Sequence, residues 1–449
     1  MFAMAALMLV SCDKDEPTTD SSFAMKATGA AYDDQCAKPR VIVSGTISSA
    51  THWTAGNVYV ISGVLRVKAK LTIDPGTYII ADSSVTTGAN GVLVITKSGE
   101  IDAQGTVGAP IVFTSWKLLD CNAATVPAPG DFGGVVLLGE ANVNTGSVTN
   151  VIEGLGDQPT PADFYYGGAS DTDNSGILKY VRIEYAGRVL PTDPVTGNGV
   201  EINGLTFGGV GSGTSVDYVQ VSWGLDDAFE FFGGKVSASH LVAFSNDDDS
   251  FDFDWGYTGG VTKAISIANE NSTHSQSSGA PDSNGIELDN NAAGSSTTII
   301  TKPVITDLSI IGFKNAADAA ALENGIHVRR LGQISLTRGT STGYSGNSTI
   351  SPNPVAGLRW DVNPTLSTKT VLSIHGFNNV VLPVPPTPYT TFQLLGSANP
   401  ITSTAASAPT WGTSSTYQPF YNEPNFNLSS GNTGAFANEA NWTATWTIF

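Results

Sequence analysis

Short apolar runs alternate with turns rich in Gly, Asp, Asn and Ser along most of this chain. Residues 226–231 (DDAFEF) match residues 248–253 (DDSFDF) at an offset of 22, and residues 242–246 (VAFSN) match residues 265–269 (ISIAN) at an offset of 23. Long segments with the 3.6-residue period of a helix are missing from the sequence, so the pattern indicates an all-β protein. A repeat of this length, built from short strands, predicts a solenoid.

A triplet in which two apolar residues flank one polar residue occurs in several of the expected strands. Neighbouring side chains in a strand point to opposite faces, so the apolar pair should enter the core and the polar residue should face outward. Equivalent strands of a solenoid stack about 4.8 Å apart. We therefore expect the outward residues to form one column: Glu201, Glu230, Asp252, Glu287 and His327.

The repeat extends over most of the chain, from residues 65–80 to residues 371–377. Two segments rich in Gly, Pro, Ser or Asp, residues 139–176 and 270–282, interrupt it and are expected to be long lateral loops. A solenoid grows by adding coils and remains one unit, so length alone does not require several domains. The prediction is a single domain over residues 36–449.

Both ends of a solenoid expose apolar core and strand edges, so caps are expected there. Residues 41–60 are strand-like and are expected to close the first coil. In residues 441–449, Trp442 and Trp446 alternate with small residues, which predicts an aromatic strand that seals the other end.

The chain of 449 residues is strongly acidic, with 21 Lys and Arg against 40 Asp and Glu and a formal net charge of −19. Such a field repels nucleic acid and anionic lipid, and it favours cations or neutral ligands. Solubility outside the cell is the alternative reason for the acidity. We therefore expect no nucleic-acid partner.

A column of like charges on neighbouring strands destabilises itself, so something must offset the repulsion. Bound Ca²⁺ is one route, since hard cations take several carboxylate oxygens. Raised carboxylate pKa values are a second route. Pairing with Arg182, Arg188, Arg329 or Arg330 is a third. The candidate Ca²⁺ ligands lie in two matching stretches: Asp226, Asp227, Asp248, Asp249, Glu230 and Asp252.

The turn aspartates among these candidates also have a structural explanation. Asp and Asn side chains cap tight corners by accepting hydrogen bonds from nearby backbone N–H groups. The sequence alone does not choose between this role and a cation site.

Catalysis is a further hypothesis for the function of the same carboxylates, because paired Asp and Glu residues serve as acid and base in glycoside hydrolysis. If the protein is an enzyme, Glu230, Asp252, Asp227, Asp249 and Arg182 are the candidate catalytic residues. Trp223, Trp255 and Tyr257 stand near the carboxylates in sequence and are candidates for stacking on sugar rings. No pattern supports a Ser or Cys nucleophile, a phosphate loop or a nucleotide site.

The N-terminal sequence is typical of an export signal. Residues 1–10 form a short apolar run, too short to span a bilayer, which is typical of the central part of a signal peptide. Leu9-Val10-Ser11-Cys12 resembles the lipobox of bacterial lipoproteins, which implies cleavage after residue 11 and a lipid on Cys12. The following residues 13–16 (DKDE) resemble a surface-export signal of Bacteroidota-type lipoproteins, with an ordinary solvated tether as the alternative. Residues 12–35 are expected to be a flexible tether.

Three cysteines are present, and Cys12 is assigned to the lipid. Cys36 and Cys121 remain as an even pair in an oxidising compartment, which predicts a disulfide between the N-terminal segment and the early coils. Two unpaired buried thiols are the alternative. Two cysteines make a poor metal site, and no Cys–His spacing supports zinc.

Several coil phrases carry a resemblance to a known family: LTIDPGT (residues 71–77), IDAQGT (101–106), APIVFTS (109–115), GDQPTPADFYYGG (156–168) and SGILKYVRIEYAG (175–187). With the LDDAFEFFGG repeat, they resemble Bacteroidota-type surface lipoproteins with a pectate-lyase-like fold. The resemblance covers residues 36–449 and implies a right-handed parallel β-helix with capped ends. The biochemical role of that family is not settled.

The combined expectation is an outer-membrane, surface-exposed lipoprotein that binds glycan or another extracellular ligand without catalysis, with Ca²⁺ as the candidate stabilising ion. One alternative is a carbohydrate-active enzyme, either a polysaccharide lyase or an inverting glycoside hydrolase that uses the acidic column. Another is a structural or adhesion module of the cell surface.

Overall fold

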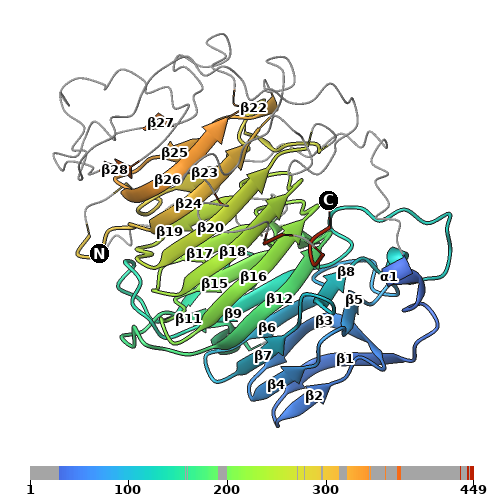
Figure 1. Ribbon diagram of the computed structural model, residues 1–449. Coiled ribbons are helices and arrows are strands. Elements are labelled where there is room, and N and C mark those ends of the chain that lie inside the picture. The colour runs from blue at the N-terminus through green and yellow to red at the C-terminus, as the bar shows by residue number, and fades with distance from the viewer. Residues whose placement is uncertain are drawn as a thin grey trace, which may run out of the picture.

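The computed structural model describes residues 30–156, 158, 160–190, 200–269, 272–277, 279–294, 297–312, 321–342, 344, 359–360, 372–375, 435, 442–443 and 445–448. Within these residues, 22 strands form one continuous sheet that winds as a right-handed parallel β-helix, as predicted (Figure 1). No helix among them is long and apolar enough to cross a membrane.

The coils have three faces, which we call faces A, B and C, each a ladder of parallel strands. Longer strands bend at a corner and belong to two faces: β1 (Arg40–Ile47), β3 (Val58–Val67), β12 (Gly176–Glu184), β16 (Ser215–Ser222), β18 (Ser237–Phe244), β20 (Gly260–Ile267), β24 (Val304–Ile311) and β26 (Ile334–Thr342). Face A also contains β5 (Tyr78–Ala81) and β8 (Ile111–Thr114).

Face B carries the predicted acidic strands. Its short strands are β6 (Val92–Ile95), β9 (Gly134–Leu138), β15 (Leu205–Gly208), β17 (Phe229–Phe232), β19 (Phe251–Asp254), β23 (Ile286–Leu288), β25 (Ile326–Val328) and β27 (Arg359–Trp360). Face C contains β2 (Thr51–Trp53), β4 (Lys70–Ile73), β7 (Glu100–Gln104) and β28 (Leu372–His375).

Small elements lie outside the three faces. The antiparallel pairs are β10 (Asn150–Val151) with β11 (Tyr165–Tyr166), β13 (Val189–Leu190) with β14 (Val200–Glu201), and β21 (Gln276–Ser277) with β22 (Ala280–Pro281). The helical turns are α1 (Ala30–Asp33), η1 (Trp116–Leu118) and η2 (Pro161–Phe164).

The sequence repeat corresponds to one coil. Phe229 pairs with Phe251 in the strand register, and Val242 pairs with Ile265, at the offsets read from the sequence. The inward phenylalanines stack along the axis, with ring centroids 5.4 Å apart for Phe229 and Phe251. These stacked rings form part of one continuous core, and burial of such apolar surface is the main stabilising term of the fold.

The corner between faces C and A is made by single residues in the left-handed conformation. Tyr180, Tyr218 and His240 have φ angles of 48°, 56° and 53°, which cost about 1 kcal/mol each for a non-glycine residue. Their rings stack in line, at 4.4 Å between Tyr180 and Tyr218 and 4.1 Å between Tyr218 and His240. Stacking of this kind offsets the backbone cost.

The first lateral loop, residues 139–176, packs against the outside of face B. Apolar side chains of β9, such as Val136 and Leu138, point outward there and would otherwise be exposed. Phe164 and Tyr166 of the loop pack in the same apolar cluster as these two residues. The loop therefore covers part of the face next to the acidic strands.

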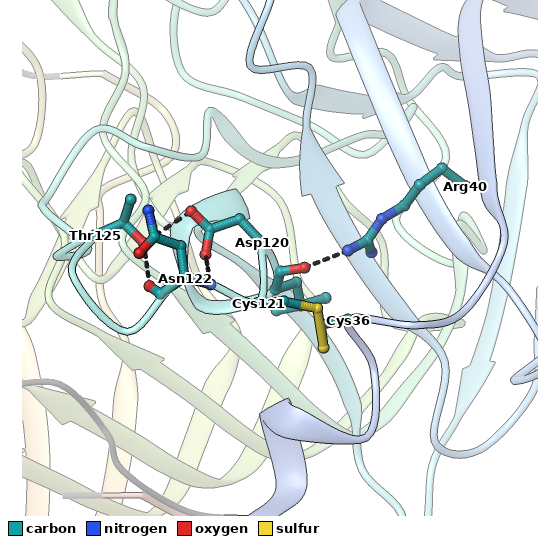
Figure 2. The surroundings of a disulfide bond; sticks show 7 residues. Cys36, Arg40, Asp120, Cys121, Asn122 and Thr125 are labelled. Carbon is teal, nitrogen blue, oxygen red and sulfur yellow. Dashed lines mark hydrogen bonds between the residues drawn. A yellow bond between two sulfur atoms is a disulfide. The ribbon is translucent and has the colours of Figure 1, made fainter.

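The N-terminal segment is fixed to the side of the β-helix. Cys36 and Cys121 form the predicted disulfide, with a Cα–Cα distance of 5.3 Å (Figure 2). The guanidinium of Arg40 donates a hydrogen bond to the carbonyl of Leu119 beside it. The tether prediction is wrong for residues 30–35, because α1 forms there and Tyr32 is buried. The signal peptide (1–11), Cys12 and the rest of the tether lie outside the described residues.

The expected caps differ from the structure. Residues 41–60 are the first coil itself, and β1 alternates between exposed and half-buried positions. Trp442 and Trp446 lie in turns, not in a strand, and they contact the corner residues of the middle coils. The stacked rings of Tyr218 and His240 supply an apolar surface on the side of the β-helix, and the C-terminal tryptophans cover that side rather than an end.

Candidate functional site

The outward column exists on face B for four of its five predicted members. Glu230 pairs with Asp252, Asp252 with Glu287, and Glu287 with His327, on the successive strands β17, β19, β23 and β25. We call Glu230, Asp252 and Glu287 the carboxylate ladder. The apolar neighbours of each member point into the core, as the alternation predicts.

Glu201 is not a member of the column, so this prediction is wrong. It lies in β14 and pairs with Val189 in an antiparallel side hairpin. Thr206 of β15 takes the position next to Glu230. The reason is that the chain leaves the coil before residue 200 and rejoins face B only at Leu205.

The members of the column face outward but are covered. Glu230, Glu287 and His327 have relative exposures of 5%, 6% and 3%, and Asp252 is half-buried. An extended groove that binds a long polymer would leave these side chains accessible. The column is therefore a buried polar site beneath the surface rather than an open active-site floor.

Burial and mutual repulsion raise the pKa values of the ladder carboxyls. Burial is the largest cause for Glu230 and Asp252, and the next is the neighbouring carboxylate, Asp252 for Glu230 and Glu287 for Asp252. Glu153 of the lateral loop adds to the effect at Glu230. Both groups are held toward the neutral form unless a cation lies between them.

A second ladder runs along the corner just before face B. The side-chain oxygen of each Asn or Asp accepts a hydrogen bond from the backbone N–H of the equivalent residue in the next coil. The distances are 3.2 Å for Asn203–Asp227, 2.9 Å for Asp227–Asp249, 2.6 Å for Asp249–Asn284 and 2.9 Å for Asn284–Asn324. Asp227 and Asp249 thus accept backbone hydrogen bonds, as the structural interpretation expects, but from the next coil rather than within their own corner.

Two groups of carboxylates lie close enough to share a cation. Asp226, Asp227 and Asp248 each offer an oxygen within 4.8 Å of the other two, and so do Asp227, Glu230 and Asp252. Five of the six predicted Ca²⁺ ligands fall in these groups. Asp249 falls in neither, and its carboxylate accepts the N–H of Asn284.

The second group fits a hard cation. The Oδ1 atom of Asp252 is buried and accepts no hydrogen bond in the described part of the chain. A buried carboxylate oxygen without a donor carries a desolvation cost that a metal ion would remove. Ca²⁺ takes oxygen ligands at 2.3–2.6 Å, and three carboxylates would supply part of its shell.

Arginine compensates the far end of the ladder. Arg329 forms ion pairs with Glu287 and, at 3.0 Å, with Asp289, and Arg330 also pairs with Asp289. Burial nevertheless raises the pKa of Glu287 to about 8, against the lowering effect of Arg329. The structure therefore uses the arginine route at this end, whereas at the other end the side-chain amide of Asn203 donates a hydrogen bond to Glu230.

Arg182 does not approach the carboxylate ladder. It lies in β12 on face A, is buried, and forms an ion pair with Glu184 at 2.9 Å. It also donates to the hydroxyl of Tyr32 and the carbonyl of Trp446. The prediction of Arg182 as a catalytic base is wrong, because its guanidinium holds the two terminal segments on another face.

The predicted sugar-stacking residues are spread over different parts of the coil. Trp223 is buried and stacks on Tyr185 at 4.9 Å, at the corner after face A. Tyr257 is fully buried in the core and donates its hydroxyl to the carbonyl of Val236. Trp255 is half-buried against the apolar cluster outside face B. The three residues form no aromatic platform, so this prediction is wrong.

A hollow of about 320 Å³ is lined by none of the predicted site residues, although its Gly256 stands between Trp255 and Tyr257 in the sequence. It is bordered by the first lateral loop and the turns after β17 and β19, and the Asp171–Lys235 ion pair of 2.6 Å crosses its rim. Neither the carboxylate ladder nor the second ladder opens into it.

Sequence reasoning missed the asparagines of the second ladder and the contact of Glu323 Oε2 with His327 Nδ1, which lie 3.3 Å apart. A signal for the asparagines was present, since Asn203, Asn284 and Asn324 each precede a Gly and an apolar residue. Asp227 and Asp249 occupy the same place before Ala228 and Ser250. Glu323 had no such signal, because its approach to His327 depends on the fold of an irregular turn.

A comparison with protein-family models agrees with the architecture. A family model described as a pectate-lyase-like β-helix domain matches residues 45–447. No curated protein sequence matches the chain. Among solved structures, tailspike protein 2 from Escherichia coli O157:H7 bacteriophage CAB120 is similar, with a TM-score of 0.32 and 12% sequence identity over 77% of this chain and 35% of the tailspike. The chain thus spans about a third of the length of that tailspike.

Proposed function

The chain belongs to the family of pectate-lyase-like β-helix domains, and on that premise we propose that it is a lipid-anchored surface protein that binds glycan or another extracellular ligand and is stabilised by Ca²⁺. In this proposal Asp227, Glu230 and Asp252 hold the ion. The observation that supports the Ca²⁺ site is the buried Oδ1 atom of Asp252, which lies among carboxylates and accepts no hydrogen bond in the described residues.

Binding is favoured over catalysis because the side chains of the column are largely buried. Glu230 and Glu287 are buried, and the candidate base Arg182 lies on another face. Asp227 and Asp249 already accept backbone hydrogen bonds, which ties them to the fold. A Ca²⁺ ion here would join β17 to β19.

A carbohydrate-active enzyme is the second candidate, and one observation favours it. His327 and Arg329 flank Glu287, whose pKa is raised to about 8, so an acid and basic groups lie together at the far end of the ladder. Such a group would exchange protons with a substrate once the residues that bury it move aside.

The proposed location draws on the N-terminal sequence and the disulfide. Leu9-Val10-Ser11-Cys12 matches the pattern of a lipoprotein cleavage site, as in Bacteroidota-type surface lipoproteins. The Cys36–Cys121 disulfide supports an oxidising compartment outside the cytoplasm. We expect lipid on Cys12, detectable by mass spectrometry of the full chain from a bacterial host. A mature chain without lipid on Cys12 would argue against the anchor.

Calorimetry and thermal unfolding test the Ca²⁺ site on the full chain carrying Cys12→Ser. We expect Ca²⁺ to bind and raise the Tm, and the Asp252→Asn and Glu230→Gln variants to lose at least 10-fold in affinity. Asp102→Asn, a change on face C, is the matched control and should bind Ca²⁺ like the parent. Absence of Ca²⁺ binding to the parent chain would overturn the metal part of the proposal.

The same preparation decides between binding and catalysis. Uronate-containing and neutral polysaccharides are offered with Ca²⁺, and both retention on the immobilised protein and release of shorter products are measured. Retention without products supports the binding function. Products that disappear in Glu287→Gln would establish the enzyme instead.

A further inference from the structure

The far end of the column holds a mixed set of ligands that the Ca²⁺ proposal does not use. Glu287 of β23 and His327 of β25 are cross-strand neighbours. Glu323 approaches them from the turn before β25. Each of the three offers one ligand atom within 4.8 Å of the other two. All three lie away from bulk solvent, with side-chain exposures of 9%, 4% and 16%.

Backbone contacts fix the position of this group. The N–H of Glu323 donates to the carbonyl of Ser283 at 2.8 Å, and the N–H of Asn324 donates to Asn284 Oδ1 at 2.9 Å. These two bonds hold the turn before β25 against the turn before β23. Glu323 is therefore placed by the corner ladder, and Glu287 and His327 by the strand register.

We propose that Glu287, Glu323 and His327 bind a Zn²⁺ ion through two carboxylate oxygens and one imidazole nitrogen. His327 Nδ1 lies 3.3 Å from Glu323 Oε2 and 3.9 Å from Glu287 Oε2. Bonds of 2.0–2.2 Å in a tetrahedral shell place neighbouring ligand atoms roughly 3.3 Å apart. The His327–Glu323 edge already has this length, the His327–Glu287 edge is about 0.6 Å too long, and the ligand atoms of Glu287 and Glu323 lie within 4.8 Å of each other.

The chemistry of the group separates it from the Ca²⁺ site. Imidazole nitrogen is a good ligand for Zn²⁺ and other divalent transition metals, whereas Ca²⁺ prefers oxygen ligands only. The carboxylates of Glu287 and Glu323 would balance the charge of one divalent ion. Three protein ligands leave the fourth position of Zn²⁺ to water or to a ligand oxygen.

Neighbouring residues supply the outer support that metal carboxylates usually have. The guanidinium of Arg329 holds one oxygen of Glu287 and is itself fixed by Asp289 at 3.0 Å. This leaves Glu287 Oε2 as the oxygen directed toward His327. Hydrogen-bonded ligands of this kind are oriented before the metal arrives.

Metal content and Co²⁺ substitution on the full chain test the proposal. We expect about one Zn²⁺ per chain after dialysis, and a Co²⁺ form with the visible absorption of a four-coordinate ion. Glu323→Gln should lower Zn²⁺ affinity at least 10-fold, because it removes one ligand in a turn and leaves the core intact. Glu100→Gln, at an exposed position of face C, is the control and should keep the affinity of the parent.

Three outcomes would overturn the site: no retained Zn²⁺, equal affinity in Glu323→Gln and Glu100→Gln, or X-ray absorption of the Zn²⁺-loaded parent without an imidazole ligand. The absorption measurement needs no variant, so it decides even if Glu323→Gln fails to fold. Ca²⁺ calorimetry on Glu323→Gln separates the two sites, because the Asp227–Glu230–Asp252 group is unchanged there.

Discussion

Glu230 and Asp252 show how a single outward position can carry more charge than its surroundings favour. Both side chains occupy the polar place in an apolar–polar–apolar triplet, and both lie beneath other parts of the protein. Burial disfavours the ionised form, and the neighbouring carboxylate disfavours it further. Without a cation, both effects hold the pair toward its protonated form.

Asp252→Asn removes this conflict and gives the first prediction. Without Ca²⁺ and at neutral pH, the variant should unfold at a higher temperature than the parent, because the amide is neutral without taking up a proton. Saturating Ca²⁺ should raise the Tm of the parent and not that of the variant. Differential scanning calorimetry with EDTA or Ca²⁺ checks both parts. A variant less stable than the parent in EDTA would contradict the account of the uncompensated pair.

Glu287 leads to a prediction for pH. Its pKa in the folded protein is about 8, above the unfolded value of about 4.3, so the folded state holds the extra proton between these limits. Its stabilising contribution is complete below about pH 4.3 and is lost as the pH rises through 8. The urea midpoint of the parent in EDTA should thus fall between pH 6.5 and 8.5. His274, with a pKa lowered to about 4, stays neutral over this range.

Glu287→Gln provides the comparison for that measurement. The amide cannot titrate, so the urea midpoint of the variant should change less over the same pH range. A parent midpoint that rises with pH would mean that the Arg329 ion pair outweighs burial at this position.

At the scale of one coil, the corner before face B combines a hydrogen-bond ladder with charge. Asp227 accepts the N–H of Asp249, while its own N–H donates to Asn203. Asn at position 227 would keep the acceptor and remove the charge. Ala would leave the N–H of Asp249 without its partner in a buried place, at a cost of about 1–3 kcal/mol.

The third prediction contrasts these two substitutions. Asp227→Asn should be as stable as the parent or more stable in EDTA, and Asp227→Ala should be less stable by about 1–3 kcal/mol. Urea unfolding followed by circular dichroism measures the difference. Equal destabilisation by Asn and Ala would show that the charge, rather than the acceptor, matters at this corner.

The sequence predicted this site correctly where successive coils have the same length. The spacing of the Phe-Glu-Phe and Phe-Asp-Phe triplets was enough to predict the register of β17 and β19, because alternation and a constant coil length determine which residues stack. Glu201 was misplaced since the hairpin before β15 breaks the coil length. Trp223 and Tyr257 were misassigned because proximity in sequence does not say which side of a corner faces the core.

Across the whole molecule, both terminal segments attach to the same side of the β-helix. Tyr32 donates to the Glu184 carboxylate at 2.9 Å, and the side chain of Gln220 bonds both the N–H and the carbonyl of Ile448. Arg182 contacts both segments. In a solenoid each coil contacts only its neighbours, so such long-range ties connect coils that would otherwise respond separately.

The Cys36–Cys121 disulfide is the covalent tie of this set, and it gives the last prediction. It joins residues 85 apart and holds the segment around α1 against the turn after β8. Because coils stabilise only their neighbours, its reduction should loosen the first coils and leave distant coils unchanged. Hydrogen exchange should show faster amide exchange in residues 30–47 of the reduced protein, with unchanged protection in β17, β19 and β23. The Cys36→Ser, Cys121→Ser double variant should behave like the reduced protein. A uniform loss of protection in all coils would instead mean that the β-helix unfolds as one cooperative unit and that the disulfide stabilises the whole.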